Sequence, residues 1–112
     1  MTETAILIYH RVADDPVDPF AQTVGTANFA EHVGVLRERE TTSVAALAGA
    51  VADRHVPAGR IAVSFDDGYV DNLRAAAPPL EAAGVPATIF VTTGPCLTGR
   101  PFWWNELAEL LT

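Results

Sequence analysis

Two adjacent carboxylates, Asp66 and Asp67, stand where this sequence could support catalysis. They follow the apolar run 61–65 and precede Gly68, so they fall where a short strand gives way to a tight turn. Neighbouring carboxylates repel each other unless a cation or a shared proton relieves them, and one can bind metal while the other handles protons. The same residues are also typical of a turn that caps a helix. Spacing alone leaves both interpretations open.

Histidines, tryptophans and a cysteine are the other candidates. His10 ends a run expected to lie beside the acidic turn, where its imidazole would either face the carboxylates or bond to loop backbone. His32 lies within a predicted helix and His55 at a helix end, so neither is assigned any chemistry. Cys96 matches no nucleophile signature and is interpreted as a loop thiol. The tryptophans at 103–104 are interpreted as core rather than as a platform for a sugar ring.

Composition excludes several classes of function. The 112 residues include no lysine, which rules out Schiff-base chemistry and a P-loop. The net charge of −7 has the wrong sign for binding nucleic acid or an anionic membrane. The longest apolar run, residues 5–9, is far shorter than the roughly 20 residues of a membrane span. Because the first residues lack the features of a secretory signal, we expect a cytoplasmic protein.

Three short apolar runs rich in branched residues predict strands of a parallel sheet, at residues 5–9, 61–65 and 87–91. Segments with helical periodicity lie between them. Strand, helix, strand, helix, strand in this order predicts right-handed parallel crossovers and an α/β architecture. In such sheets ligands bind outside the carboxyl ends of the strands, which is where Asp66 and Asp67 fall.

Apolar side chains at helical spacing predict four helices, over residues 28–40, from a cap at Ser43 to about Pro57, over 69–84 with a break at the prolines 78–79, and over 105–111. The first is expected to begin at a capping box formed by Asn28 and Glu31. Residues 13–27 and 94–101 are expected to be loops.

The residues around the acidic turn resemble a known family. Residues 62–69, Ala-Val-Ser-Phe-Asp-Asp-Gly-Tyr, resemble the first motif of the polysaccharide deacetylases, the NodB-homology domain of carbohydrate esterase family 4, whose usual form is T-F-D-D-G. Segments 6–12, 85–91 and 102–107 resemble the same family in the same order. Ser64 stands where the family has threonine and keeps the hydroxyl. Together these matches extend over nearly the whole chain.

The resemblance implies a metal-dependent hydrolase that removes acetyl groups from N-acetylated sugars, breaking a non-peptide carbon–nitrogen bond on a distorted (β/α) barrel. By motif position, Asp66 matches the general base and Asp67 a ligand of zinc or a similar divalent metal. A carbohydrate is the implied substrate, and His10 is a candidate for contacting it. These roles are chemically coherent, because a metal polarises the acetyl carbonyl and acidifies a bound water while a carboxylate takes the water's proton.

Part of the family pattern is absent from this sequence. The H-[ST]-x-x-H motif, which supplies two metal ligands, does not follow Asp67, because all three histidines precede it. A catalytic metal usually has three protein ligands, so Asp67 alone is not expected to hold one tightly. A complete barrel typically needs about 250 residues. Residues 1–112 are therefore interpreted as the N-terminal portion of such a domain, with its first three parallel strands and their helices.

Two functions from different classes stay open. In one, the chain belongs to a deacetylase whose barrel a second chain or a C-terminal segment completes. In the other, it is a non-catalytic fragment or a carbohydrate-binding or pairing module. A phosphatase of the haloacid-dehalogenase type is disfavoured, because it needs D-x-D after its strand and here Asp66 and Asp67 are adjacent.

Overall fold

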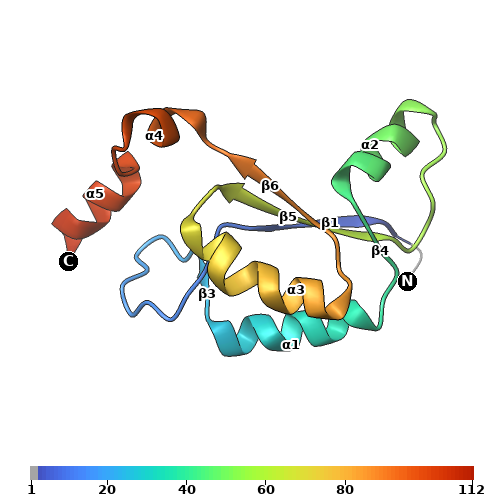
Figure 1. Ribbon diagram of the computed structural model, residues 1–112, viewed down its shortest axis with the longest axis horizontal. Helices are drawn as coiled ribbons and strands as arrows, with labels where there is room; N and C mark the ends of the chain where they lie inside the picture. Colours follow the sequence, from blue (N-terminus) through green and yellow to red (C-terminus); the bar gives the residue numbers. More distant parts are fainter. Residues whose placement is uncertain (1–2) are drawn as a thin grey trace.

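The computed structural model describes residues 3–112. Its centre is a four-stranded parallel sheet of β1 (Ala5–Tyr9), β4 (Thr41–Thr42), β5 (Ile61–Asp67) and β6 (Ala87–Val91). β1 pairs with one side of β5, while β4 and β6 pair with successive parts of its other side (Figure 1). The three predicted strands and their parallel α/β order are confirmed. The short strand β4 was not predicted.

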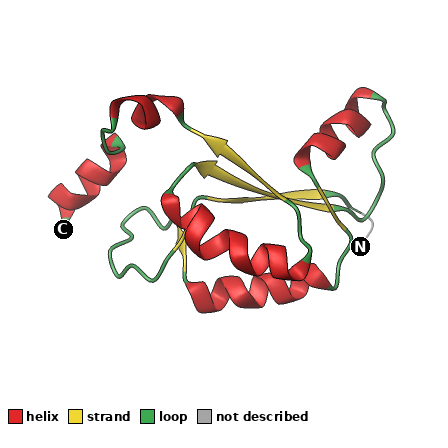
Figure 2. Cartoon of the chain, in the orientation of Figure 1, coloured by secondary structure: helices red, strands yellow, loops and turns green. Residues whose placement is uncertain are grey.

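The helical segments of the described chain are α1 (Thr26–Arg37), α2 (Val44–Ala52), the π-helical turn η1 (Asn72–Ala76), α3 (Ala77–Ala83), α4 (Thr93–Thr98) and α5 (Trp103–Leu111) (Figure 2). A second, two-stranded sheet pairs β2 (Arg11–Val12) with β3 (Thr23–Val24). The segment 13–27, expected to be a loop, therefore contains a strand and the start of α1. Within residues 3–112, no helix combines the length and the apolar character needed to cross a bilayer.

The predicted capping box at the start of α1 is wrong. The helix begins at Thr26, two residues before Asn28, and its N-cap Gly25 makes no side-chain cap bond. The carboxylate of Asp14 instead accepts hydrogen bonds from the Thr26 hydroxyl at 2.6 Å and the Thr26 backbone N–H at 2.9 Å. These bonds hold the pKa of Asp14 below its usual value. A negative charge at a helix N-terminus also interacts favourably with the helix dipole. Asp14, a loop residue, thus takes the place of the predicted capping box.

The other helix ends follow from caps and prolines. Ser43 caps α2 as predicted, its Oγ accepting from the Ala46 N–H at 3.1 Å. The helix after the acidic turn changes type at Ala77, so that both prolines sit in the first turn of α3, where a missing N–H costs no helical bond. Residues 94–98, part of the segment 94–101 predicted to be loop, belong to α4, which Gly99 ends in a left-handed conformation at φ 69°.

The core lies between the sheet and the pair α1 and α3, which run side by side along one face (Figure 1). Three aromatic rings form its centre: the Tyr9 centroid lies 5.3 Å from the centroids of both Phe29 and Phe65. The Tyr9 hydroxyl makes a 2.9 Å hydrogen bond with Nδ1 of His32, which satisfies its polar end. Burial raises the pKa of Tyr9.

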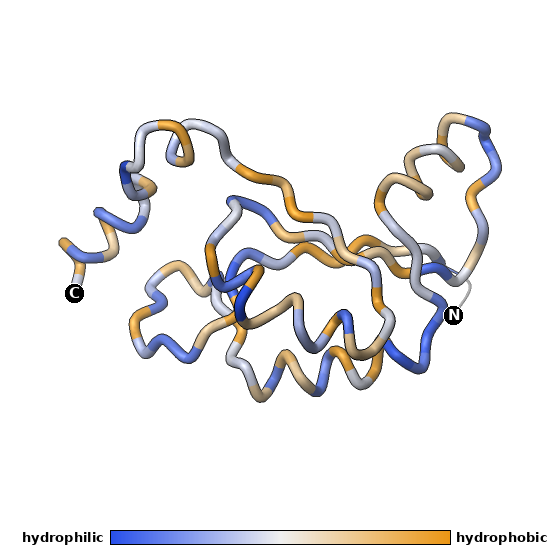
Figure 3. The backbone as a smooth tube through the Cα atoms, viewed as in Figure 1, coloured by the Kyte–Doolittle hydropathy of each residue, from blue (hydrophilic) through white to orange (hydrophobic). Residues whose placement is uncertain are grey.

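The opposite side of the sheet, which we call the open face, is largely uncovered. Strand side chains alternate between faces, so Ile6 and Ile8 point away from the core that Tyr9 joins. Ile6 is 49% exposed, Ile8 61% and Phe90 of β6 50%. Figure 3 shows the apolar stretch of β6 along the sheet. Apolar strand surface of this kind normally lies against another layer.

The dimensions of the molecule are consistent with a sheet whose open face is incompletely covered. Its accessible surface is 7252 Å², whereas a folded monomer of this mass typically exposes about 5,900 Å². The radius of gyration is 15.6 Å, against about 13 Å for a compact domain of this length. Helix α5 contributes to the excess because none of its residues is buried.

We predict that the purified 112-residue chain self-associates, or forms a loosely packed state that binds a hydrophobic dye. At about 25 cal/mol per Å² of apolar surface, a few hundred uncovered Å² forfeit several kcal/mol, comparable with the roughly 5–15 kcal/mol stability of a domain. Size-exclusion chromatography with light scattering and a thermal melt measure both properties.

Matched variants locate the responsible surface. Ile8→Asp and Phe90→Asp put charges on the open face and should reduce association, whereas Val51→Asp, at a comparably exposed position on α2, should not. A compact wild-type monomer with a sharp cooperative melt would contradict the prediction.

Candidate active site at the carboxyl ends of the strands

Parallel pairing brings the carboxyl ends of β1, β5 and β6 to one edge of the sheet (Figure 1). The register sets Tyr9 opposite Phe65, so the next residues, His10 and Asp66, lie at the same level. Nε2 of the His10 imidazole is 4.0 Å from Oδ2 of Asp66. The structure thus brings His10 beside the acidic turn, which is one of the two arrangements left open by the sequence.

Both carboxylates belong to the strand rather than to the turn after it. Asp66 and Asp67 are the last residues of β5 because they pair with Phe90 and Val91 of β6. Since side chains alternate along a strand, Asp66 lies on the open face, opposite the side where Phe65 joins the core. A ligand would therefore reach Asp66 and His10 from the uncovered side of the sheet.

The backbone leaves the extended conformation after Asp66. Asp67 has φ 78° and Gly68 has φ 77°, a left-handed conformation that is uncommon for a residue other than glycine. A Cβ at Gly68 would lie 3.1 Å from Cγ1 of Val91, so a side chain there would require Val91 to shift by a few tenths of an ångström and would be strained at this φ. The Thr92 N–H donates to the Asp67 carbonyl at 3.4 Å. Strained backbone of this kind is characteristic of functional sites, where surrounding contacts maintain it.

The pKa of the Asp67 carboxyl is raised, chiefly by burial and additionally by the charge of Asp66, while His10 opposes the shift. The negative charge on Asp67 is therefore unfavourable as the site stands. A cation placed against the two carboxylates would relieve both the repulsion and the desolvation.

A complete metal site is not present among residues 3–112. In this part of the chain no group of three or more histidine, cysteine, aspartate or glutamate side chains is arranged to hold a metal ion. His32 is bonded to Tyr9 on the core side of the sheet. His10 and the two carboxylates alone therefore do not provide the three protein ligands that a catalytic metal usually has.

Sequence reasoning missed two residues that touch the His10 segment, Asp71 and Asn72. The Asn72 side chain is 2% exposed, and its Nδ2 donates to the His10 carbonyl at 3.0 Å. Asp71 accepts from the backbone N–H of Val12 at 3.3 Å. Their position a few residues after the acidic turn was the only available signal, because the contacts join segments about 60 residues apart.

An aromatic cluster lies beyond the turn. Nε1 of Trp104 donates to the Tyr69 hydroxyl at 2.7 Å, and the Phe102 ring stacks on Trp104 with centroids 4.5 Å apart. The prediction that both tryptophans belong to the core is wrong: no residue of α5, Trp104 included, is buried, and Trp103 is 68% exposed. Its exposure follows from the position of α5, which packs into no layer of the described fold.

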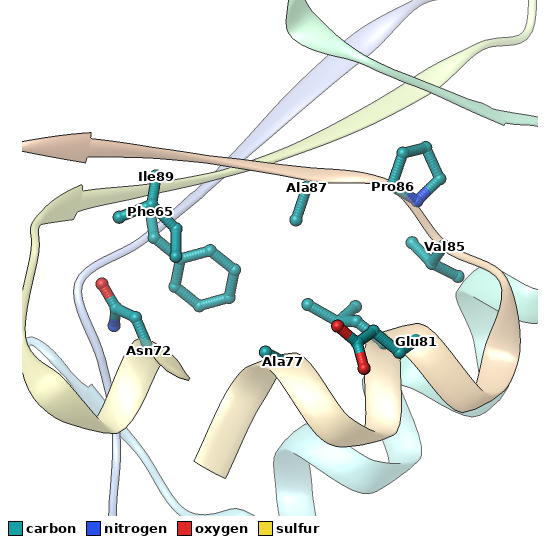
Figure 4. A pocket seen from close by; sticks show the side chains of 9 residues that line it. Phe65, Asn72, Ala77, Glu81, Val85, Pro86, Ala87 and Ile89 are labelled. Atoms are coloured by element: carbon teal, nitrogen blue, oxygen red, sulfur yellow. The ribbon is translucent and has the colours of Figure 1, made fainter. Parts of the chain in front are cut away.

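A cavity of about 230 Å³ opens on the other face of the sheet, between β6 and α3. Figure 4 shows its lining, which includes Phe65, Ile89 and Val85, with Asn72 at one end. Because this lining is mostly apolar and lies on the face opposite Asp66, the cavity is separate from the candidate site.

Comparisons with known proteins agree on one family. The model of the family described as polysaccharide deacetylase matches residues 53–110, which include the acidic turn. The structure of IcaB from Ammonifex degensii is 27% identical over 99% of this chain and 49% of that one, with a TM-score of 0.72. A de-N-acetylase from Aggregatibacter actinomycetemcomitans is 26% identical, with a TM-score of 0.63, over 77% of this chain and 36% of that one.

The deacetylase PplD of Streptococcus pyogenes, solved with acetate, shares the fold at 18% identity and a TM-score of 0.70, over 97% of this chain and 53% of that one. The chain thus spans between about a third and about a half of the length of these structures. No curated protein sequence matches it.

We predict that Asp67→Asn stabilises the fold at pH 7. The folded-state pKa of Asp67 lies above the ordinary value of 3.8, so the folded state binds its proton more tightly than the unfolded state. Stability therefore falls as the pH rises from about 3.8 through the raised pKa, and the neutral amide avoids this loss. Solvent screening of a partly exposed group limits the gain to less than about 1 kcal/mol.

Urea midpoints from far-UV circular dichroism at pH 7 and pH 3 measure the effect. The gain should disappear at pH 3, where the carboxyl is protonated, and Asp53→Asn on the exposed end of α2 should show no such pattern. An equal gain at both pH values would show that charge is not the cause.

Proposed function

Because the chain belongs to the polysaccharide deacetylase family, we propose that it is the N-terminal portion of a deacetylase domain and supplies part of its active site. The family acts on carbohydrates and is generally metal-dependent. The observation that carries the proposal is the meeting of Asp66, Asp67 and His10 at the carboxyl edge of the sheet, within the family's acidic motif.

The proposed reaction is hydrolysis of an acetamide on a sugar. Water adds to the acetyl carbon, the carbon–nitrogen bond breaks, and acetate and a free amine result. Asp66 is proposed to take the proton from the attacking water, because its carboxylate lies on the open face within reach of a ligand. His10, whose Nε2 is 4.0 Å from that carboxylate, is proposed to contact the substrate.

Asp67 is proposed as one ligand of a divalent metal such as zinc. A carboxylate oxygen is a suitable ligand for zinc, and the raised pKa of Asp67 is consistent with a group that gains from a neighbouring cation. Since the described residues do not complete a metal site, no step of the reaction is assigned to the metal in this chain alone.

We further propose that another segment or chain completes the barrel against the open face. Three features support this: the outer sides of β1 and β6 have no strand partner within residues 3–112, the open face is apolar, and IcaB is about twice as long as the region matched here. The completing part would supply the missing metal ligands. If none exists, the chain is a non-catalytic binding or pairing module.

We predict that the 112-residue chain alone releases no acetate from N-acetylglucosamine oligomers, even with added zinc, cobalt or nickel. The reason is that residues 3–112 form no cluster of three metal-ligating side chains. An acetate assay with each metal tests this. Metal-dependent release that Asp67→Ala removes would contradict it and would show that the site is already complete.

The division of roles can be tested after fusing or co-expressing the chain with the C-terminal segment of a family member. Asp67→Ala should abolish metal uptake. Asp66→Asn should retain the metal but lower turnover by about 10²–10⁴-fold, because only the proton acceptor is removed. Metal analysis and acetate release separate the two variants, and equal metal loss in both would refute the assignment.

A further inference from the structure

His10 occupies a gap between two sheets. It follows the last residue of β1 and precedes β2, so it belongs to neither strand. The ladder with β5 ends one residue earlier, at Tyr9. Its imidazole nevertheless lies 4.0 Å from Asp66. His10 is therefore outside both strand ladders, and contacts from side chains can contribute to its position.

Two adjacent residues bind the chain at His10, Arg11 and Val12. Nδ2 of Asn72 donates to the His10 carbonyl at 3.0 Å. One Asp71 oxygen accepts from Nε of Arg11 at 3.1 Å, and the other accepts from the Val12 N–H at 3.3 Å. We call this arrangement the 71–72 clamp.

The environment of the clamp makes these bonds stronger than surface contacts. Asn72 is 2% exposed and also donates to Oδ1 of Asp71 at 3.3 Å, so both clamp side chains hold each other. The Arg11 guanidinium lies over the Tyr69 ring, 5.0 Å from its centroid. When the partner of a buried amide is removed, the desolvation penalty of that amide is no longer compensated. The clamp therefore favours the one backbone position of residues 10–12 in which these bonds are made.

The clamp and the carboxylates come from one short stretch, because Asp71 lies five residues after Asp66 in the sequence. Another side chain bonds to β1 without touching His10: Oγ of Ser64 donates to the Leu7 carbonyl at 3.1 Å. Ser64 is likewise buried, which provides a matched comparison.

We propose that Asp71 and Asn72 are positioning residues, which fix the His10 backbone so that its imidazole stays beside Asp66. This inference rests on the proposed function in giving the His10–Asp66 pair a role, but the positioning itself is independent of turnover. The clamp does not touch the reacting atoms, and it acts only through His10.

The test measures how strongly the Asp66 side chain affects the labelling rate of the His10 imidazole. The 112-residue chain and its variants are labelled with diethyl pyrocarbonate, and labelling rates at each histidine are read by peptide mass spectrometry. His55, exposed beyond α2, serves as the internal reference. In the wild-type background, Asp66→Asn should change the His10 rate severalfold and leave the His55 rate unchanged, because only His10 lies beside that carboxylate.

Clamp variants should remove this dependence. In the Asn72→Leu and Asp71→Ala backgrounds, Asp66→Asn should no longer alter the His10 rate. Asp71→Asn, which keeps an oxygen to accept from Val12, should restore part of the dependence. Ser64→Ala, which removes a buried bond to β1 elsewhere, should retain it fully. Hydrogen exchange of β5 peptides identifies any variant that has lost the sheet.

Loss of the dependence in the clamp variants, with retention in Ser64→Ala, supports positioning. Retention in all variants overturns it, as does equal loss in Ser64→Ala, which would indicate general loosening. Absence of the dependence in the wild type also overturns it. None of these results alters the acetate assays, so a failure of positioning is distinguishable from a failure of the proposed function.

Discussion

The fold depends on the parallel pairing of β5 between β1 and β6. This pairing places the aromatic core on one face and brings His10, Asp66 and the end of β6 to one edge. The same geometry forces the side chains that alternate with the core residues onto the other face. The site and the uncovered apolar surface are therefore two consequences of one arrangement of strands.

This arrangement explains why residues 3–112 contain the acidic turn of the family but no complete metal site. The acidic turn needs only β5, β6 and Gly68, all of which are present, so its left-handed backbone is already formed. A metal site needs ligands from several strand ends, and residues 3–112 provide too few. Under the proposed function, the completing side chains would reach the site at the open face beside Asp66.

The sequence predicted what depends on local patterns. Apolar runs of branched residues identified the three main strands, and the family motif located Asp66 and Asp67. The predictions from the sequence failed where contacts between residues far apart in the chain determine the structure. Asp14 replaced the expected capping box because a loop folds back on α1, and the contacts of Asn72 with His10 cross about 60 residues. The exposure of Trp103 likewise depends on which layers are present around α5, and side-chain periodicity does not contain this information.

We propose that the chain carries part of a metal-dependent site that is completed on the open face. Calorimetric titration of zinc into the 112-residue chain, and into its assembly with the C-terminal segment of a family member, tests this proposal. We expect one tight site per assembly and no tight site in the chain alone. Tight, stoichiometric binding by the chain alone, lost in Asp67→Ala, would contradict it.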